Sequence, residues 1–184
     1  ENEYGSFGND QRYLKFIEDA LTGRGIDVPL FTSDGPEDEM LQYGTLPHIY
    51  KAVNFGSKAD EAFEKLVEYQ PARPKMCAEF WNGWFDHWGE RHHTRAARDA
   101  AQTLEEILAA GASVNLYMFH GGTNFGFMNG ANASPGPKYQ PTVTSYDYDA
   151  PLDEAGNPTD KYTAFREIIG RLTGQTLMPV PDPV

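Results

Sequence analysis

Two glutamates of the sequence, Glu3 and Glu79, stand in settings that could support catalysis. Glu3 follows Asn2, Glu79 precedes Trp81, and both segments are rich in aromatic residues, Asn and Gly. Glycoside hydrolysis requires a pair of carboxyl groups on one face, because one protonates the leaving oxygen while the other attacks or stabilises the anomeric carbon. The pairing alone also allows two ordinary solvated acids among the 27 Asp and Glu residues.

Tryptophans follow Glu79 closely, at positions 81, 84 and 88. An aromatic plane beside a carboxylate suits the apolar face of a sugar ring, which makes Trp81 a candidate binding residue. The spacing of Trp84 and Trp88 equally fits the core of a helix, and composition favours packing for these two.

Phenols and carboxylates recur in the second half of the chain. Tyr117 lies near the end of an apolar run, and the segment 146–149 reads Tyr-Asp-Tyr-Asp. Such groups can hydrogen-bond sugar hydroxyls or orient a nucleophile. A buried tyrosine with a bonded hydroxyl and an acidic surface turn are equally compatible with the pattern.

Other chemistries find less support in the sequence. His87, His92 and His93 are close in sequence, but adjacent histidines diverge in direction and no HExxH or CxxC motif accompanies them, so no metal site is expected. The glycines between residues 121 and 130 spell neither a phosphate loop nor a dinucleotide fingerprint, so no cofactor is expected. Cys77 has no histidine nearby and is a poor candidate nucleophile.

Helical and strand patterns alternate along the chain. Apolar periodicity and capping residues predict four helices: 9–21, one that follows the N-cap Ser57, 94–110 and 161–172. Short apolar runs predict four strands: 28–33, 52–55, 76–81 and 114–119. This order predicts an α/β fold of parallel βα units, with Asp34-Gly35-Pro36 opening an acidic loop. Residues at the carboxyl ends of the strands, Glu79 and Asp34 among them, would share one face. Four such units are half of a closed barrel.

Composition narrows the classes of partner. The 184 residues (20.6 kDa) are 40% hydrophobic, which suits one folded domain. Lys and Arg number 15 against 27 Asp and Glu, so the formal charge of −12 would repel nucleic acid. No apolar run approaches the roughly 20 residues that span a bilayer, so no membrane partner is expected. Because the chain starts at Glu1 rather than Met and ends in a Pro-rich tail, both ends are expected to be internal to a longer protein.

Four stretches together carry a specific family resemblance: Glu1–Ser6, Cys77–Gly89, Asn115–Gly126 and Thr144–Leu152. With them the chain resembles glycoside hydrolase family 35, the retaining β-galactosidases, over nearly its whole length. The resemblance implies that Glu3, after the fourth strand of a barrel, is the general acid/base, and that Glu79, after the seventh, is the nucleophile. It also implies a β-galactoside oligosaccharide or glycoconjugate as substrate, with the terminal galactose bound by Asn2, Tyr117, Tyr148 and Trp81.

The resemblance further implies a (β/α)8 TIM barrel of which this chain holds only the second half, about strands 5 to 8 with their helices. Residues 1–174 would then be a partial catalytic domain, and 175–184 a Pro-rich linker to a missing C-terminal region. The missing N-terminal half of the barrel would be a necessary partner, and the isolated chain is expected to be poorly active or inactive. The alternatives are an exo-acting β-glucosaminidase, a galactan-acting relative, or a non-catalytic carbohydrate-binding remnant.

Overall fold

The computed structural model describes residues 2–133 and 139–180, as an α/β chain that divides into two compact units. Unit 1 comprises residues 2–80 and 106–115, and unit 2 comprises residues 81–105, 116–133 and 139–180. No helix in the described part of the chain is long and apolar enough to cross a membrane.

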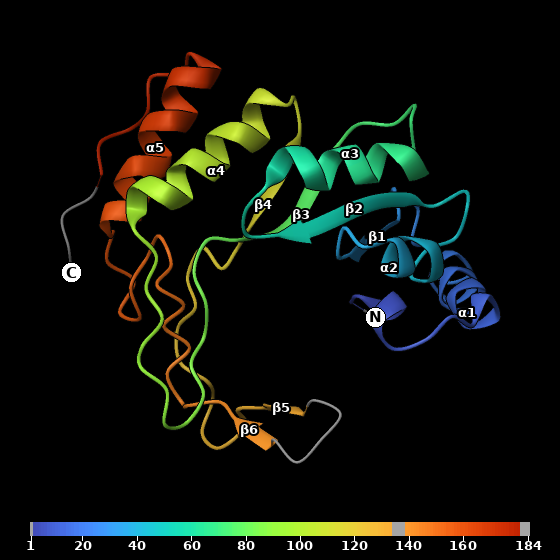
Figure 1. The fold of residues 1–184 in the computed structure, drawn as a ribbon, viewed down its shortest axis with the longest axis horizontal. Coiled ribbons are helices and arrows are strands. Elements are labelled where there is room, and N and C mark those ends of the chain that lie inside the picture. The colour runs from blue at the N-terminus through green and yellow to red at the C-terminus, as the bar shows by residue number, and fades with distance from the viewer. Residues whose placement is uncertain (1, 134–138, 181–184) are drawn as a thin grey trace. The chain divides into compact units, whose positions relative to one another are not determined.

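A four-stranded sheet organises unit 1 (Figure 1). Its strands follow one another in chain order: β1 (Phe31–Asp34), β2 (Tyr50–Phe55), β3 (Met76–Trp81) and β4 (Ser113–Tyr117). β1 pairs with β2, and β2 with β3, in parallel, which confirms the predicted class of fold. The last residue of β3 and the last two of β4 belong to unit 2.

The pairing of β2 with β3 contains an irregularity. Val53 pairs with Cys77, the register then shifts, and Asn54 pairs with Glu79. Val53 and Cys77 are completely buried, and so is Asn54. The apolar residues on this pair of strands specify the register, because a slip by one residue would turn them to the other face of the sheet.

Helix α3 (Ala59–Tyr69) packs against β2 in unit 1 (Figure 1). Ala59, Ala62, Phe63 and Leu66 form its buried stripe at helical spacing. The predicted N-cap Ser57 is wrong: the cap is Lys58, in the left-handed conformation and without a capping side chain. Two acidic residues in the first turn stabilise the positive end of the helix dipole in its place.

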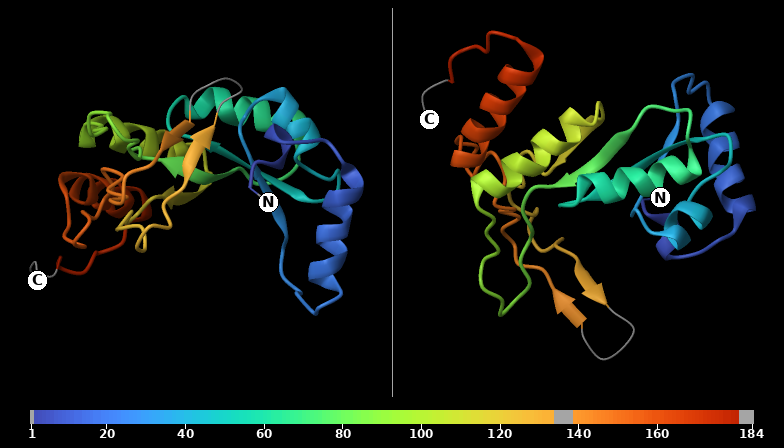
Figure 2. Two further views of the ribbon diagram at one scale, coloured as in Figure 1. Left: turned by 90° about the horizontal axis from the view of Figure 1, so that it is seen from below. Right: turned by 45° about the horizontal axis from the view of Figure 1, so that its top comes forward.

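The remaining helical elements of unit 1 are α1 (Gln11–Thr22), α2 (Asp38–Tyr43) and the 3-10 turn η1 (Tyr4–Ser6). α1 confirms the predicted helix, and Asp10 caps it by accepting a hydrogen bond from the Arg12 amide. No residue of α1 is buried. A hollow beside this helix is lined by Tyr13, Leu14 and Ile17 of α1 and by residues of β1. Figure 2 shows the ribbon of α1 at the outer edge of unit 1. The expected acidic loop is wrong in part, because this segment contains the helix α2.

Unit 2 consists mainly of long loops attached to helices. Its elements are most of α4 (Ala97–Ala109), α5 (Asp160–Thr173) and the hairpin of β5 (Ala131–Ala133) and β6 (Tyr139–Pro141). Both helices confirm predicted ones, although α4 begins later than expected. α5 is capped by Thr159 and ends at Gly174, whose φ of 66° is the left-handed conformation that favours glycine.

The prediction that Trp84 and Trp88 pack in a helical core is wrong. Residues 82–96 contain no helix, and the two tryptophans are 39% and 72% exposed. Asp86 holds this segment in a looped conformation, because its carboxylate accepts a hydrogen bond from the backbone N–H of His93. The helical spacing of these two tryptophans therefore occurs in a loop.

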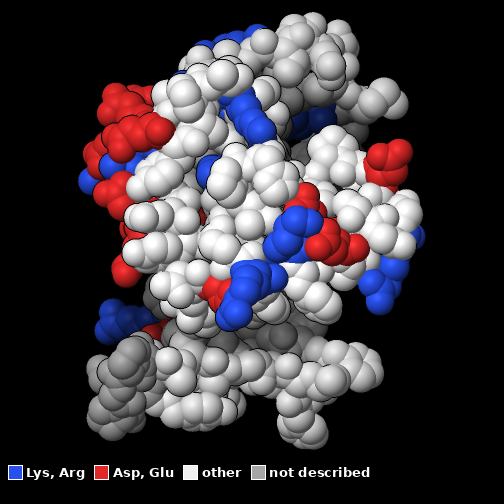
Figure 3. Space-filling view, turned by 90° about the vertical axis from the view of Figure 1, so that its right-hand side faces the viewer, with Lys and Arg blue, Asp and Glu red and all other residues white. Residues whose placement is uncertain are grey.

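On the face of the molecule shown in Figure 3, Lys and Arg side chains are interspersed with Asp, Glu and neutral residues. Among the described residues visible there, the basic groups do not gather into one patch. That face therefore does not present the concentrated positive surface on which nucleic-acid binding depends.

Close backbone packing in unit 2 makes one glycine sensitive to substitution. A Cβ atom on Gly121 would lie 1.8 Å from the carbonyl oxygen of Tyr146, whereas a Cβ on Gly130 would meet nothing within 4 Å. We expect Gly121→Ala to destabilise the protein by about 1–3 kcal/mol, since the backbone must move to accommodate it. Thermal unfolding should show this loss, with Gly130→Ala as a nearly neutral control. Equal midpoints for the two variants would contradict the close packing.

Candidate active site

Glu3 is attached to the sheet of unit 1 at two points. Its backbone N–H donates to the carbonyl oxygen of Ser33 over 2.9 Å, and its carboxyl Oε1 accepts from Asn54 Nδ2 over 3.0 Å. The backbone of Glu3 has a φ of 52°, which is uncommon for a residue other than glycine, and Glu3 is the N-cap of η1. Contacts with β1 and β2 therefore position both the backbone and the carboxyl group of Glu3.

Glu79 lies beside the same asparagine. It is paired in register with Asn54 across β2 and β3, and adjacent strands are about 4.8 Å apart. Asn54 thus contacts the Glu3 carboxyl and is the sheet neighbour of Glu79. Both glutamates predicted from the sequence are therefore neighbours of Asn54 in unit 1, Glu3 through a hydrogen bond and Glu79 through the register of the sheet.

Asn2, the third predicted site residue of unit 1, is exposed. It lines the hollow between α1 and β1 together with Thr32 and Ser33. Asn2 is therefore close to the strand to which Glu3 is bonded.

A buried carboxylic acid completes the polar cluster of unit 1. Asp34, at the end of β1, is 1% exposed, and burial raises its pKa to about 6. The backbone amide of Gly5 and the hydroxyl of Thr32 act in the opposite direction, and the charge of Glu3 adds to the increase. Gly44 leaves room for this carboxyl, because a Cβ there would lie 2.0 Å from Asp34 Oδ1.

In unit 2, two of the predicted binding tyrosines belong to one aromatic cluster. Tyr148 is buried, and its ring lies edge-on to that of Tyr117 with 5.7 Å between centroids. Tyr146 stacks on Tyr148 at 5.9 Å, and its hydroxyl is 3.3 Å from that of Tyr117. Tyr146 therefore joins the two predicted residues as a third member of the cluster.

Trp81 is linked to this cluster through Trp84. The two indole rings meet edge-on at 5.8 Å, and Trp84 lies 6.2 Å from the ring of Tyr148. Arg95 holds the Trp81 backbone by donating from Nη1 to its carbonyl oxygen over 3.2 Å. The candidate sugar-binding residues of unit 2 are thus parts of one packed group.

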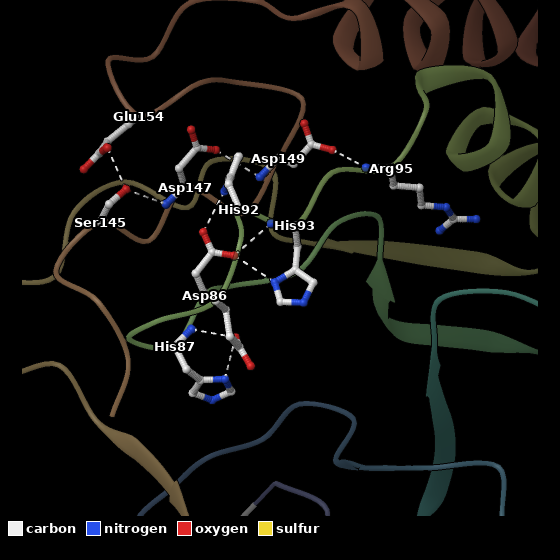
Figure 4. Close-up of polar contacts among 10 residues, drawn as sticks. Asp86, His87, His92, His93, Arg95, Ser145, Asp147, Asp149 and Glu154 are labelled. Atoms are coloured by element: carbon white, nitrogen blue, oxygen red, sulfur yellow. Dashed lines mark hydrogen bonds and ion pairs between the residues drawn. The ribbon is translucent and has the colours of Figure 1, made fainter. Parts of the chain in front are cut away.

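A half-buried ion pair supports the segment that carries Tyr148. Asp149 has a φ of 52°, and its carboxylate accepts from the Arg95 backbone N–H at 2.7 Å (Figure 4) and from Lys161 Nζ at 2.6 Å. Lys161 is 3% exposed, and its burial lowers its pKa while Asp149 acts against that decrease. Gly83 allows close contact here, because a Cβ on it would lie 1.7 Å from the Tyr148 carbonyl oxygen.

Three histidines of unit 2, His87, His92 and His93, bind carboxylates within a loop (Figure 4). His92 and His93 each place Nδ1 within 2.8 Å of the Asp86 carboxylate, and His87 lies 2.9 Å from Glu90. The hydrogen bond to Asp86 raises the pKa of His92. Among the described residues, no group of three His, Cys, Asp or Glu side chains could hold a metal ion.

Cys77 is buried, and burial raises the pKa of its thiol to about 12. A thiol with so high a pKa is protonated at neutral pH and is not nucleophilic. The prediction that Cys77 is a poor nucleophile is confirmed.

Asn54 is a site residue that the sequence-based reasoning did not identify. The available signal was a polar amide inside an otherwise apolar strand, Ala52-Val53-Asn54-Phe55, since buried polar groups need a specific partner. Glu3 and Glu79 lie in unit 1, whereas Trp81, Tyr117 and Tyr148 lie in unit 2. That all five line one pocket stays a prediction.

Comparison with known proteins establishes the family. Residues 1–172 match the model of glycosyl hydrolases family 35. The chain is 49% identical to a β-galactosidase of Xanthomonas manihotis over 188 residues, which cover 100% of this chain and 31% of that protein. It is 46% identical to a β-galactosidase of Bos taurus, over 98% of this chain and 28% of that protein. It is 48% identical to a β-galactosidase of Homo sapiens, over 98% of this chain and 27% of that protein.

The chain therefore belongs to glycosyl hydrolases family 35. It spans between 27% and 31% of the length of these three relatives.

The raised pKa of Asp34 predicts a pH-dependent stability. The folded-state pKa of about 6 exceeds the ordinary aspartate value of 3.8, so between these values the folded state binds more protons and stability falls as pH rises. We expect Asp34→Asn to raise stability by about 2–3 kcal/mol near neutral pH and to leave it almost unchanged near pH 4. Thermal unfolding at both pH values measures this difference.

The exposed Asp60, in the first turn of α3, supplies the control for that experiment. Asp60→Asn should change stability by only a few tenths of a kcal/mol at either pH. An Asp34→Asn variant that loses stability equally at both pH values would contradict the buried, destabilising carboxylate.

Proposed function

We propose that the full-length protein is a retaining β-galactosidase that releases terminal β-D-galactose, with Glu79 as nucleophile and Glu3 as general acid/base. The observation that carries this proposal is the attachment of Glu3 to Asn54, the sheet neighbour of Glu79. Membership of family 35 and relatives named β-galactosidase, at 46–49% identity, support the reaction and the sugar.

In the first step of the proposed reaction, the Glu79 carboxylate attacks the anomeric carbon and the bond to the leaving oxygen breaks. Glu3 donates its proton to that oxygen, and a galactosyl ester of Glu79 remains. In the second step, Glu3 removes a proton from water, whose oxygen attacks the anomeric carbon and releases Glu79. This double displacement retains the anomeric configuration and requires carboxyl groups roughly 5–5.5 Å apart.

The same proposal assigns binding of the galactose to Asn2, Trp81, Tyr117 and Tyr148. The aromatic cluster of Trp81, Tyr117 and Tyr148 supports this assignment, because rigid ring planes complement the apolar face of a sugar while phenol groups bind its hydroxyls. The reaction written above uses no metal and no cofactor.

We further propose that residues 1–174 are the second half of a (β/α)8 catalytic barrel and that 175–184 form a linker, of which 181–184 lie outside the described residues. The support is the four-stranded sheet in which β1, β2 and β3 pair in parallel, since a barrel of this kind has eight parallel strands and active-site residues at their carboxyl ends. The substrate would be a β-galactoside oligosaccharide or glycoconjugate. The names of the relatives favour galactose over glucosamine as the sugar released.

Substitution of the two glutamates in the full-length protein tests the proposed roles. Glu79→Gln should lower kcat/KM by at least about 10³-fold on every β-galactoside, because no covalent intermediate can form. Glu3→Gln should cost about 10²–10⁴-fold on a substrate with an alkyl leaving group. It should cost far less on dinitrophenyl β-galactoside, whose leaving group departs without a proton. Turnover of both substrates is measured for each variant.

Glu64→Gln is the matched control, since Glu64 is an exposed residue of α3. It should leave turnover unchanged. Full activity of Glu79→Gln would contradict the assigned nucleophile. A wild-type protein that cleaves a β-glucosaminide in preference to a β-galactoside, or that binds galactose without cleaving either, would contradict the proposed function.

A further inference from the structure

Asn54 is a completely buried amide in a strand whose neighbouring positions are apolar. A buried amide costs free energy unless both of its ends are hydrogen-bonded. Its oxygen accepts from Ser33 Oγ over 2.8 Å, and its nitrogen donates to Glu3 Oε1 over 3.0 Å. One end of this amide is thus bonded to the carboxyl group proposed as acid/base.

The contacts among these three residues form a closed ring. The Glu3 N–H donates to the Ser33 carbonyl oxygen, the Ser33 hydroxyl donates to Asn54 Oδ1, and Asn54 Nδ2 donates to Glu3 Oε1. In this ring the amide oxygen of Asn54 accepts from the Ser33 hydroxyl, and its NH₂ group faces Glu3. An ionised carboxylate only accepts hydrogen bonds, so this orientation of the amide is the one that suits Glu3.

An amide N–H bonded to Oε1 has a chemical consequence for a carboxylic acid. An oxygen that accepts this hydrogen bond is favoured as the carbonyl oxygen of the protonated acid, so the proton resides on the other oxygen. Asn54 is also neutral, so it can stand between the positions of Glu3 and Glu79 without adding a third negative charge.

We propose that Asn54 is a positioning residue for the acid/base, which holds Glu3 Oε1 as a hydrogen-bond acceptor so that Oε2 carries the transferable proton, and that Ser33 orients Asn54 for this role. This inference rests on the proposed function, in which Glu3 delivers a proton to the leaving oxygen.

The test is leaving-group dependence in the full-length protein. Asn54→Leu removes the amide at nearly constant volume. Its kcat/KM should fall about 10–100-fold on an alkyl β-galactoside, because the proton of Glu3 is no longer directed at the leaving oxygen. On dinitrophenyl β-galactoside, which needs no proton, the change should be much smaller. Ser33→Ala should shift the ratio of the two rates in the same direction by a smaller factor.

Asn115→Leu is the matched control. Asn115 also donates from its side-chain amide, but to the Ala78 carbonyl oxygen of the neighbouring strand over 3.0 Å. Its substitution should leave the ratio of the two rates unchanged.

Equal losses on both substrates for Asn54→Leu, or no loss on either, would overturn the positioning role. If Asn54→Leu does not fold, Ser33→Ala becomes the deciding variant. An unchanged ratio of its rates on the two substrates would then overturn the inference. Failure of the proposed function is seen separately: the wild-type protein would then cleave neither galactoside, or Glu3→Gln would lose the same factor on both.

Discussion

The parallel pairing of β2 with β3 is the constraint on which the candidate site of unit 1 depends. Apolar residues specify that pairing: Val53 and Cys77 are opposite each other, as are Phe55 and Phe80, and all four are buried. The register shift between Val53 and Asn54 then sets Asn54 beside Glu79. Hydrophobic burial thus determines where the polar atoms of the site lie, and the hydrogen bond from Asn54 extends that order to Glu3.

Both units support their functional segments with buried polar groups rather than with apolar contacts alone. In unit 1, Asp34 is buried next to the β1 residue whose carbonyl oxygen binds the Glu3 N–H. Its raised pKa shows that burying the charged carboxylate is unfavourable. In unit 2, Lys161 is buried against Asp149, the residue after Tyr148. The pair of Lys161 with Asp149 contributes little net stability, but removing one partner is costly, so the pair restricts the loop that carries Tyr148 to one conformation.

Sequence patterns predicted the elements whose signals are local. The strand 76–81 and the helices α1 and α5 follow from apolar periodicity. α2 was missed because its six residues are too few to show a helical period and its acidic start was read as a loop. The tryptophans of the loop 82–96 have helical spacing, but hydrogen bonds to Asp86 favour a looped backbone there.

The two glutamates were found from composition and motif, whereas their contacts were not. The bond between Asn54 and Glu3 joins residues 51 positions apart, and no periodicity in a single sequence encodes such a pairing. Nor could spacing reveal that Tyr146 bridges Tyr117 and Tyr148, because that depends on how two loops fold back on each other.

Covalent trapping of the nucleophile would identify the carboxylate that attacks the anomeric carbon. The full-length protein would be incubated with 2-deoxy-2-fluoro-β-galactosyl fluoride, in which fluoride leaves readily and the remaining fluorine slows hydrolysis of the ester that forms. Peptide mass spectrometry then locates the sugar. The account predicts a single fluorogalactosyl ester on Glu79, absent from Glu79→Gln. A label on another carboxylate, or hydrolysis of galactosides with inversion and no label, would contradict it.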